Sequence, residues 1–328
     1  MMRRASLAAL LIVVGACDPP PEPPYAGPAF TIDPDAVSVS GISAGAYMAG
    51  QMHVAKSASI RGAGLIAGGP YGCAQNSLTT ALETCTKTGA PEVEPLLEAM
   101  AEAAEAGTID SLVNLEGSPV WLFRSPADPL VGQALLDAAA EQYRALGSSV
   151  TVVDDIPAAH GVPTLASGAA CDSFESPYLN ACDYDAAGEI LAALHGDLKP
   201  RVEATGELQS VTVRGAADAS LLSEAYLYVP MACAAGETCG LHVFFHGCSQ
   251  SSELVGDAVA RGAGFNEWAE ANRLLVLYPQ VASSKLAPMN PLGCFDWWGY
   301  TDHRYATRFG TQVQVVSGLM EALAGQGR

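Results

Sequence analysis

A Gly-x-Ser-x-Gly motif, formed by Gly41, Ser43 and Gly45, lies between two segments of different character. The residues before Ser43, AVSVSGI, are typical of a strand, and the residues after it, AGAYMAGQMHVA, are typical of a helix. A sharp strand-to-helix turn strains the backbone of its central residue, and side chains at the flanking positions would clash with it. The motif therefore predicts a turn that exposes the Ser43 hydroxyl at the carboxyl end of a strand.

Strand-like and helix-like segments alternate along the rest of the chain, which favours an α/β fold with a mostly parallel sheet flanked by helices. Nothing in the composition of residues 30–328 marks a linker, so we expect one domain. The predicted strands are 36–42, 62–67, 119–125, 148–153, 208–213, 225–229, 241–245 and 274–278. The predicted helices are 44–55, 92–105, 132–146, 185–194, 253–272 and 311–323.

A serine hydroxyl in such a turn becomes a nucleophile only with a base and an orienting acid. The predicted strand PVWLFRS runs directly into Asp128, which places this carboxylate at the edge of the sheet where ligands bind. Asp154 and Asp155 directly precede the next loop, where capping a turn is the simpler role. Asp110 lies in a less defined region, so we expect Asp128 to be the acid.

The histidine best placed to act as the base is His160, which follows the predicted strand SVTVVDD. His195 ends a predicted helix, where a histidine commonly satisfies carbonyl groups. His53 lies on the helix after Ser43, and His303 follows no strand. The order serine, aspartate, histidine, each after a successive strand, is that of the α/β-hydrolases.

Hydrolases of this kind need a second amide, besides that of Ala44, to hold the oxyanion, and it comes from a loop after an earlier strand. The chain before Ser43 is too short to contain that strand. A matching segment, LHVFFHGCSQ, instead occurs late in the chain, where a strand leads into His246 and Cys248. The sequence therefore predicts a circular permutation that moves the usual first half to the C-terminus.

Several long motifs in one order, rather than one short motif, now carry a specific resemblance. The segments GISAGAYMAGQ, SPADPLV, AHGVPT, CDYDAAGEIL, FFHGCSQ, NEWAEANRLLVLYPQ and NPLGCFDWWGY resemble the poly(3-hydroxybutyrate) depolymerases with an N-terminal lipase box, over residues 36–325. The resemblance implies a permuted α/β-hydrolase fold and a catalytic triad of Ser43, Asp128 and His160. It also implies an oxyanion hole formed by the backbone amides of Ala44 and Cys248.

Nine cysteines are present, and eight remain when Cys17 is set aside. Sequence does not determine their connectivity, but local spacing favours three pairs and leaves a fourth, which the family resemblance also supports. No Cys-x-x-Cys pair occurs and no histidine cluster lies near a cysteine, so we expect no metal site and no cofactor. The expected disulfides are Cys73–Cys85, Cys171–Cys182, Cys233–Cys239 and Cys248–Cys294.

The segment CFDWWGY offers aromatic surface beside the expected site if Cys248 pairs with Cys294. Because neighbouring residues of a strand point to opposite faces, we expect at most one of Trp297 and Trp298 to face the substrate. Tyr300 and His246 are further candidates for substrate contact. Asn290 and Asp296 are expected to shape the same loop.

The N-terminus predicts export. Residues 1–17 combine a basic start and an apolar run too short to span a bilayer with VGAC, which resembles a lipoprotein cleavage site, so Cys17 is the expected lipidation site. An ordinary signal peptide that happens to end near a cysteine is the alternative. Residues 18–29 form a proline-rich spacer, which favours extended polyproline geometry. We expect the protein in the periplasm or at the cell surface, lipid-anchored or otherwise secreted.

A formal net charge of −19 disfavours nucleic acid and anionic lipid as partners, since both would be repelled. An uncharged aliphatic polyester or oligoester is the expected substrate, the protein is expected to be a monomer, and a lipid anchor is its only expected membrane contact. No threonine-rich linker or separate polymer-binding domain follows the last helix, so strong adsorption to crystalline polymer is not expected.

Two alternatives remain open from sequence. The same triad would serve a feruloyl, acetyl-xylan or aromatic polyester esterase. A non-catalytic lipoprotein that binds hydrophobic ligands would have no use for a serine, a histidine and an oxyanion segment together, so it is less well supported.

Overall fold

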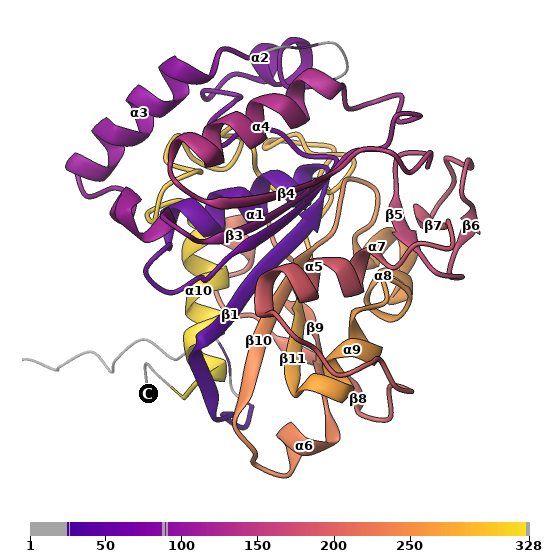
Figure 1. Cartoon of the computed structure of the whole chain (residues 1–328). Coiled ribbons are helices and arrows are strands. Elements are labelled where there is room, and N and C mark those ends of the chain that lie inside the picture. Colours follow the sequence, from indigo (N-terminus) through magenta and orange to yellow (C-terminus); the bar gives the residue numbers. More distant parts are fainter. Residues whose placement is uncertain (1–24, 26, 87–88, 90, 326–328) are drawn as a thin grey trace, which may run out of the picture.

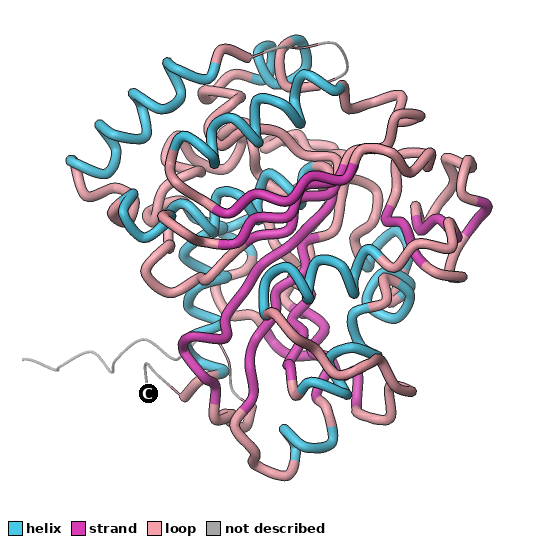
Figure 2. The backbone as a smooth tube through the Cα atoms, in the orientation of Figure 1, coloured by secondary structure: helices cyan, strands magenta, loops and turns pink. Residues whose placement is uncertain are grey.

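We describe the fold from a computed structural model, which covers residues 25, 27–86, 89 and 91–325. The expected signal peptide, the lipidation site Cys17 and most of the proline-rich spacer lie outside these residues. Figure 1 shows a central sheet with helices on both sides, and Figure 2 shows the same path coloured by secondary structure.

The central sheet contains all eight strands expected from the sequence. In spatial order they are β4 (Ser149–Val153), β3 (Pro119–Phe123), β2 (Ala63–Ile66), β1 (Ile32–Ile42), β10 (Cys239–Phe245), β11 (Leu274–Tyr278), β9 (Glu224–Val229) and β8 (Glu207–Thr212). The first six strands in this order, from β4 through β1 to β10 and β11, pair in parallel with one another, whereas β9 is antiparallel to both of its neighbours. The expectation of a mostly parallel sheet is confirmed.

The sheet order shows how the permuted chain closes. Strand β1, which precedes Ser43, lies between β2, the next strand in sequence, and β10, which comes far later. Gly41 is paired in register with Phe245, the last residue of β10. The serine turn and the His-Gly segment therefore leave the same edge of the sheet side by side.

Helices cover both faces of the sheet, and each face has its own apolar cluster (Figure 1). One cluster takes residues from α1 (Ala44–Ala55), α3 (Val93–Glu105), α4 (Gln133–Ala145) and α10 (Thr311–Leu323). The other takes residues from α5 (Ala186–His195), α8 (Ala258–Gly262) and α9 (Phe265–Asn272). In β10 the alternation is direct, because Val243 and Phe245 face the first cluster and Phe244 faces the second.

The predicted helix 253–272 is wrong as a single element. The segment forms three short helices, α7 (Ser252–Val255), α8 and α9, because Gly256 and Gly264 adopt φ values of 60° and 90° that interrupt a helix. Sequence analysis also missed α2 (Leu78–Glu83), α6 (Met231–Ala234) and a small sheet in which β7 (Leu179–Ala181) lies between β5 (Val162–Thr164) and β6 (Ala169–Ala170).

Among the described residues, four disulfides join the same pairs that spacing and resemblance indicated: Cys73–Cys85, Cys171–Cys182, Cys233–Cys239 and Cys248–Cys294. Within the described ranges, no helix has the length and apolar character needed to cross a bilayer. The same residues contain no group of three or more potential ligands placed to hold a metal ion.

Several histidines are enclosed in the core and held neutral by burial. Desolvation lowers the pKa of His53 to about 3 and that of His246 to about 4. His242 is also fully buried, and desolvation holds its pKa well below the usual 6.5. The Ser38 and Ser40 hydroxyls bind its two ring nitrogens at 2.8 and 2.7 Å.

We expect these histidines to make the fold sensitive to acid. A lowered folded-state pKa means that only the unfolded chain takes up protons as the pH falls below 6.5. Each fully buried histidine should then remove about 1.4 kcal/mol of stability per pH unit, down to its folded-state pKa. Urea unfolding at about pH 7.5 and about pH 5 tests this, and His53→Gln should flatten the dependence. The exposed His303→Gln is the control, and equal stability at both pH values would contradict the expectation.

Candidate active site

Ser43 sits at the junction between β1 and α1, in the strand-to-helix turn that the motif predicts. Its backbone has φ 57° and ψ −121°, a strained combination for any residue other than glycine. The Ser43 amide donates a 2.9 Å hydrogen bond to the carbonyl of Ile66 at the end of β2. This bond and the following helix hold the serine in its unusual conformation, and we call residues 41–45 the elbow.

The two glycines of the elbow are required by the close approach of β10. A Cβ atom on Gly45 would lie 2.5 Å from the carbonyl oxygen of His246 and nearer still to that of Phe245. A Cβ atom on Gly41 would lie 2.7 Å from the same Phe245 oxygen. Because these obstacles are backbone atoms, no side-chain movement relieves them.

His160 and Asp128 are brought together by the loops that follow β4 and β3. His160 Nδ1 donates a 2.7 Å hydrogen bond to Asp128 Oδ2, and both side chains are almost fully buried. The other oxygen of Asp128 accepts from the amides of Leu130 and Val131 at 2.7 and 3.0 Å. The carboxylate is thus fixed, and it fixes the tautomer that leaves His160 Nε2 without a proton.

The Ser125 hydroxyl connects the acid loop, residues 124–132 after β3, to the histidine loop, residues 154–161 after β4. Ser125 Oγ accepts from the amide of Ala127, next to Asp128, and from the amide of Ala158, two residues before His160. The Ala159 amide then donates to the carbonyl of Cys171, whose disulfide closes the small sheet. The geometry of the pair therefore depends on a buried serine and a covalent link.

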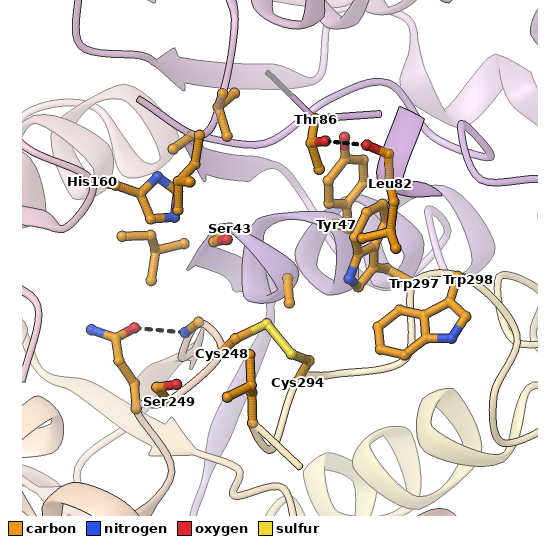
Figure 3. Close-up of a pocket in the computed structure, with 18 of the residues that line it drawn as sticks. Ser43, Tyr47, Leu82, Thr86, His160, Cys248, Ser249, Cys294, Trp297 and Trp298 are labelled. Carbon is orange, nitrogen blue, oxygen red and sulfur yellow. Dashed lines mark hydrogen bonds between the residues drawn. A yellow bond between two sulfur atoms is a disulfide. The ribbon is translucent and has the colours of Figure 1, made fainter. Parts of the chain in front are cut away.

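Ser43 and His160 face one pocket, as Figure 3 shows. Within the described part of the chain, no hydrogen bond joins the Ser43 hydroxyl to the imidazole. Such contacts are commonly longer in the absence of substrate and shorten when a substrate is bound. The arrangement has the parts of a serine nucleophile, a base and an acid.

The rival histidines lie elsewhere. His53 lies on α1 and is buried against Tyr143 and Ser118, whereas His195 bonds Ser38, and neither histidine lines the pocket. The side chain of His303 is 84% exposed.

The rival carboxylates are also away from His160. Asp110 binds the amide of Ala58 and pairs with Arg308. Asp154 and Asp155 are exposed on the surface.

The second expected oxyanion donor lies on the loop 246–251, which we call the oxyanion loop. The Gly247 amide donates a 2.7 Å hydrogen bond to Gln250 Oε1, and the Ser249 amide donates a 2.6 Å hydrogen bond to the carbonyl of Leu292. Among the described residues, the Cys248 amide between them has no hydrogen-bond partner. Ala44 begins α1, so its amide has no acceptor within the helix.

The pocket has a volume of about 680 Å³ and is largely apolar. Among its described lining residues, His160 is the one histidine, and none is an aspartate, glutamate, lysine or arginine. Exposed apolar side chains stand around it on α2, on the loop before β7 and on the loop between β11 and α10. The sequence patterns did not predict them, because such patterns do not show which apolar side chains remain exposed. These residues are Leu78, Leu82, Phe174, Met289 and Leu292.

The tryptophan loop, residues 294–301, is folded around one buried carboxylate. Asp296 is 1% exposed and accepts hydrogen bonds from the amides of residues 298–301 and from the Thr301 hydroxyl. Asn290 bonds both the amide and the carbonyl of Cys294. Both residues shape the loop, as the sequence indicated.

Four residues were expected to contact substrate, and the structure separates them. Trp297 and Trp298 both line the pocket, contrary to the expectation that at most one would, because the segment is a loop and strand alternation does not apply. Trp297 also stacks on Tyr47 with ring centroids 4.5 Å apart.

The other two do not line the pocket. Tyr300 turns its hydroxyl to Cys294, Asn290 and Gln312. His246 is buried, where its ring bonds the Gly247 carbonyl and the Val281 amide. Both are corrections, because the backbone around them captures their polar groups.

The two tryptophans should respond differently to truncation. Trp298→Ala should raise KM for an oligoester about tenfold with little change in kcat, because the ring contributes contact area to substrate and transition state alike. Trp297→Ala should instead cost roughly 3–5 kcal/mol of stability, because that ring is buried against Tyr47. Steady-state kinetics and urea unfolding of both variants test this, and similar profiles for the two would contradict it.

The chain was compared with known proteins. No protein-family model matches it. The poly(3-hydroxybutyrate) depolymerase of Delftia acidovorans is 36% identical over 313 residues, which are 90% of this chain and 61% of that protein. The chain thus spans less than two thirds of that relative. The polyhydroxybutyrate depolymerase of Talaromyces funiculosus is 34% identical over 318 residues, which are 91% of this chain and 90% of that protein.

Two solved structures share the fold with a TM-score of 0.84. One is the crystal structure of a PHB depolymerase from Penicillium funiculosum, at 32% identity. The other is a serine-to-alanine variant of a PHB depolymerase complexed with an R3HB trimer, at 31% identity. Each match covers 91% of this chain and 98% of the other.

Proposed function

The chain belongs to the polyhydroxybutyrate depolymerase family, and we propose that it is a serine esterase that hydrolyses poly(3-hydroxybutyrate) or its short-chain oligoesters. One observation carries the proposal. Ser43 on its strained turn and the buried His160–Asp128 pair face the same apolar pocket. A binding protein gains nothing from a strained serine and an oriented imidazole at one point.

The reaction proceeds in two acyl-transfer steps. The Ser43 oxygen attacks the ester carbonyl while His160 Nε2 takes the hydroxyl proton, and Asp128 stabilises the imidazolium that forms. The imidazolium then gives its proton to the departing alkoxide, which leaves as an alcohol. A water molecule, deprotonated by His160, attacks the acyl-enzyme, and His160 returns that proton to the Ser43 oxygen as the acid is released.

The negative charge on the tetrahedral intermediate is held by the amides of Ala44 and Cys248. Both are on backbone that is already fixed, Ala44 by the start of α1 and Cys248 by its disulfide to Cys294. Fixed donors need no reorganisation when the charge develops, and each is worth about 10²–10³ in rate.

The substrate class follows from the pocket and the surface charge. The apolar lining, with Trp297 and Trp298, suits an uncharged aliphatic chain, and a net charge of −19 disfavours polyanionic substrates. The exposed leucine and methionine side chains around the pocket suit contact with a hydrophobic surface.

Clearing of a turbid suspension of amorphous poly(3-hydroxybutyrate) tests the proposal. We expect clearing by the wild type and none by Ser43→Ala, with slower cleavage of a feruloyl ester. Cleavage of the feruloyl ester without clearing would assign the site to plant-polysaccharide esters instead. Failure to cleave any ester would favour a hydrophobic-ligand-binding protein.

We further propose that the protein is exported and acts as a monomer. The four disulfides of the described residues support export, because disulfides are rare in a reducing cytosol. Lipid attachment at Cys17 is tested by membrane fractionation. Cys17→Ser should move an anchored protein to the soluble fraction, and an unchanged distribution would argue against the anchor.

A further inference from the structure

One buried glutamine joins the oxyanion loop to residues 177–178, which directly precede β7. Gln250 is 2% exposed, and its Oε1 accepts a 2.7 Å hydrogen bond from the Gly247 amide. Its Nε2 donates to the carbonyls of Pro177 and Tyr178, at 2.9 and 3.3 Å. Both ends of the side-chain amide are therefore engaged, one on each side.

The carbonyl of Tyr178 also contacts the strand that follows His160. It accepts a 2.9 Å hydrogen bond from the amide of Val162, the first residue of β5 and two residues after His160. One carbonyl thus receives a bond from the strand that follows the base and a bond from Gln250. Among the described residues, the two bonds from Gln250 Nε2 are the hydrogen bonds that join the oxyanion loop to residues 177–178.

The bond to Gly247 decides which amide of the oxyanion loop faces the substrate. Gly247 and Cys248 are consecutive, and their two amides compete for the role of oxyanion donor. Gln250 Oε1 occupies the first amide, and the Leu292 carbonyl occupies the amide of Ser249 on the other side. The Cys248 amide remains available to the substrate, and the amides before and after it are both fixed by hydrogen bonds.

We propose that Gln250 is a positioning residue that sets the Cys248 amide at a fixed distance from His160, and this rests on the proposed esterase function. Glutamine suits the position because it accepts and donates through one side chain. Glutamate of the same length can accept from Gly247 in either protonation state, but its ionised form has no proton to donate to the two carbonyls. Leucine can do neither.

Displacing the Cys248 amide should weaken the transition state more than it weakens substrate binding. The transition state places a full negative charge on the oxygen that the Cys248 amide holds, whereas the bound ester carries only a carbonyl dipole there. Displacing the amide without removing it should therefore lower kcat while leaving KM nearly unchanged. A misplacement of about 1 Å can cost on the order of 10²-fold in rate.

A second buried glutamine in the same chain supplies a matched control. Gln142 is 1% exposed, accepts from the Tyr71 amide at 2.7 Å and donates to the Tyr71 carbonyl at 3.1 Å. It does not line the pocket that holds Ser43. Its replacement removes the same kinds of buried bond without touching the oxyanion loop.

The experiment measures kcat, KM, thermal midpoint and the rate of inactivation by a serine-directed phosphonate for Q250L, Q250E, Q142L and the wild type. We expect kcat to fall about 10- to 100-fold in both Gln250 variants at about pH 8, with KM within about threefold. Phosphonate inactivation should slow in parallel, because the tetrahedral adduct also needs the Cys248 amide. Q142L should lose thermal stability and keep its kcat.

The pH dependence of Q250E adds a signature that a structural defect would not produce. Facing two carbonyls in a buried site, the introduced carboxyl is held protonated to unusually high pH, and the protonated form again donates. The ratio of kcat for Q250E to kcat for the wild type should therefore rise as the pH is lowered from about 8 to about 5.5.

Each outcome has one meaning. Folded Q250E and Q250L with kcat within twofold of the wild type would overturn the proposal. A raised KM with unchanged kcat would also overturn it, because Gln250 would then be a substrate contact. A wild type that is neither active on esters nor labelled by the phosphonate would instead refute the esterase function itself, and the role of Gln250 with it.

Discussion

Replacing His160 by alanine should lower ester turnover by about 10⁴- to 10⁶-fold while the protein remains folded. Without the imidazole, the Ser43 hydroxyl has no group to accept its proton, and the departing alkoxide has none to protonate it. The loss in Ser43→Ala should be of the same size, and the double variant should lose no more than either alone, because the two side chains act as one unit. Rates on a soluble nitrophenyl ester measure all three.

The matched control for this prediction is His195→Ala. His195 is the last residue of α5 and also bonds a serine hydroxyl, but that serine is Ser38, which does not line the pocket. Turnover should stay within about twofold of the wild type when assayed well below the unfolding temperature. Loss of activity in His195→Ala with retention in His160→Ala would show that the base has been assigned wrongly.

Gly45→Ala should destabilise the protein by roughly 3 kcal/mol or prevent it from folding, because the new methyl group would strike two backbone carbonyls at the end of β10. Gly50→Ala, five residues further along the same helix, should have the opposite effect. A Cβ atom there would lie 3.8 Å from the Tyr143 hydroxyl oxygen and 3.9 Å from Leu65, which is ordinary contact, so only the helix propensity changes, a gain of about 0.5–1 kcal/mol.

Urea unfolding of the two glycine variants measures the difference between them. A Gly45→Ala protein as stable as the wild type would contradict the close approach of the elbow to β10. The comparison is sensitive to the permuted topology, because β10 comes near the end of the chain and the elbow near its beginning.

The parts of the site that follow strands were accessible from sequence. Strand ends of a parallel sheet share one edge, so residues that follow strands converge. Asp128 and His160 follow the neighbouring strands β3 and β4, and the structure joins them by a 2.7 Å hydrogen bond. The late position of the His-Gly segment was equally informative. To lie beside Ser43, the segment must follow a strand that pairs with β1, and β10 is that strand.

The parts of the site built by loops were not accessible in this way. The sequence suggests that Tyr300 and His246 could contact substrate. In the folded chain, nearby backbone and side-chain groups form hydrogen bonds with their polar atoms. Trp297 and Trp298 share the pocket because Asp296 gathers the amides of an irregular loop, and no periodic pattern describes such a loop. Gln250 has no sequence signal, since its role depends on a carbonyl from a distant segment.

The most direct test of the whole account is mass spectrometry after treatment with a serine-directed phosphonate at neutral pH. The account predicts one adduct per chain, located on the peptide that contains Ser43, and its absence in His160→Ala over the same time. An unlabelled wild-type protein, or an adduct on another serine, would contradict the assignment of Ser43 as the nucleophile.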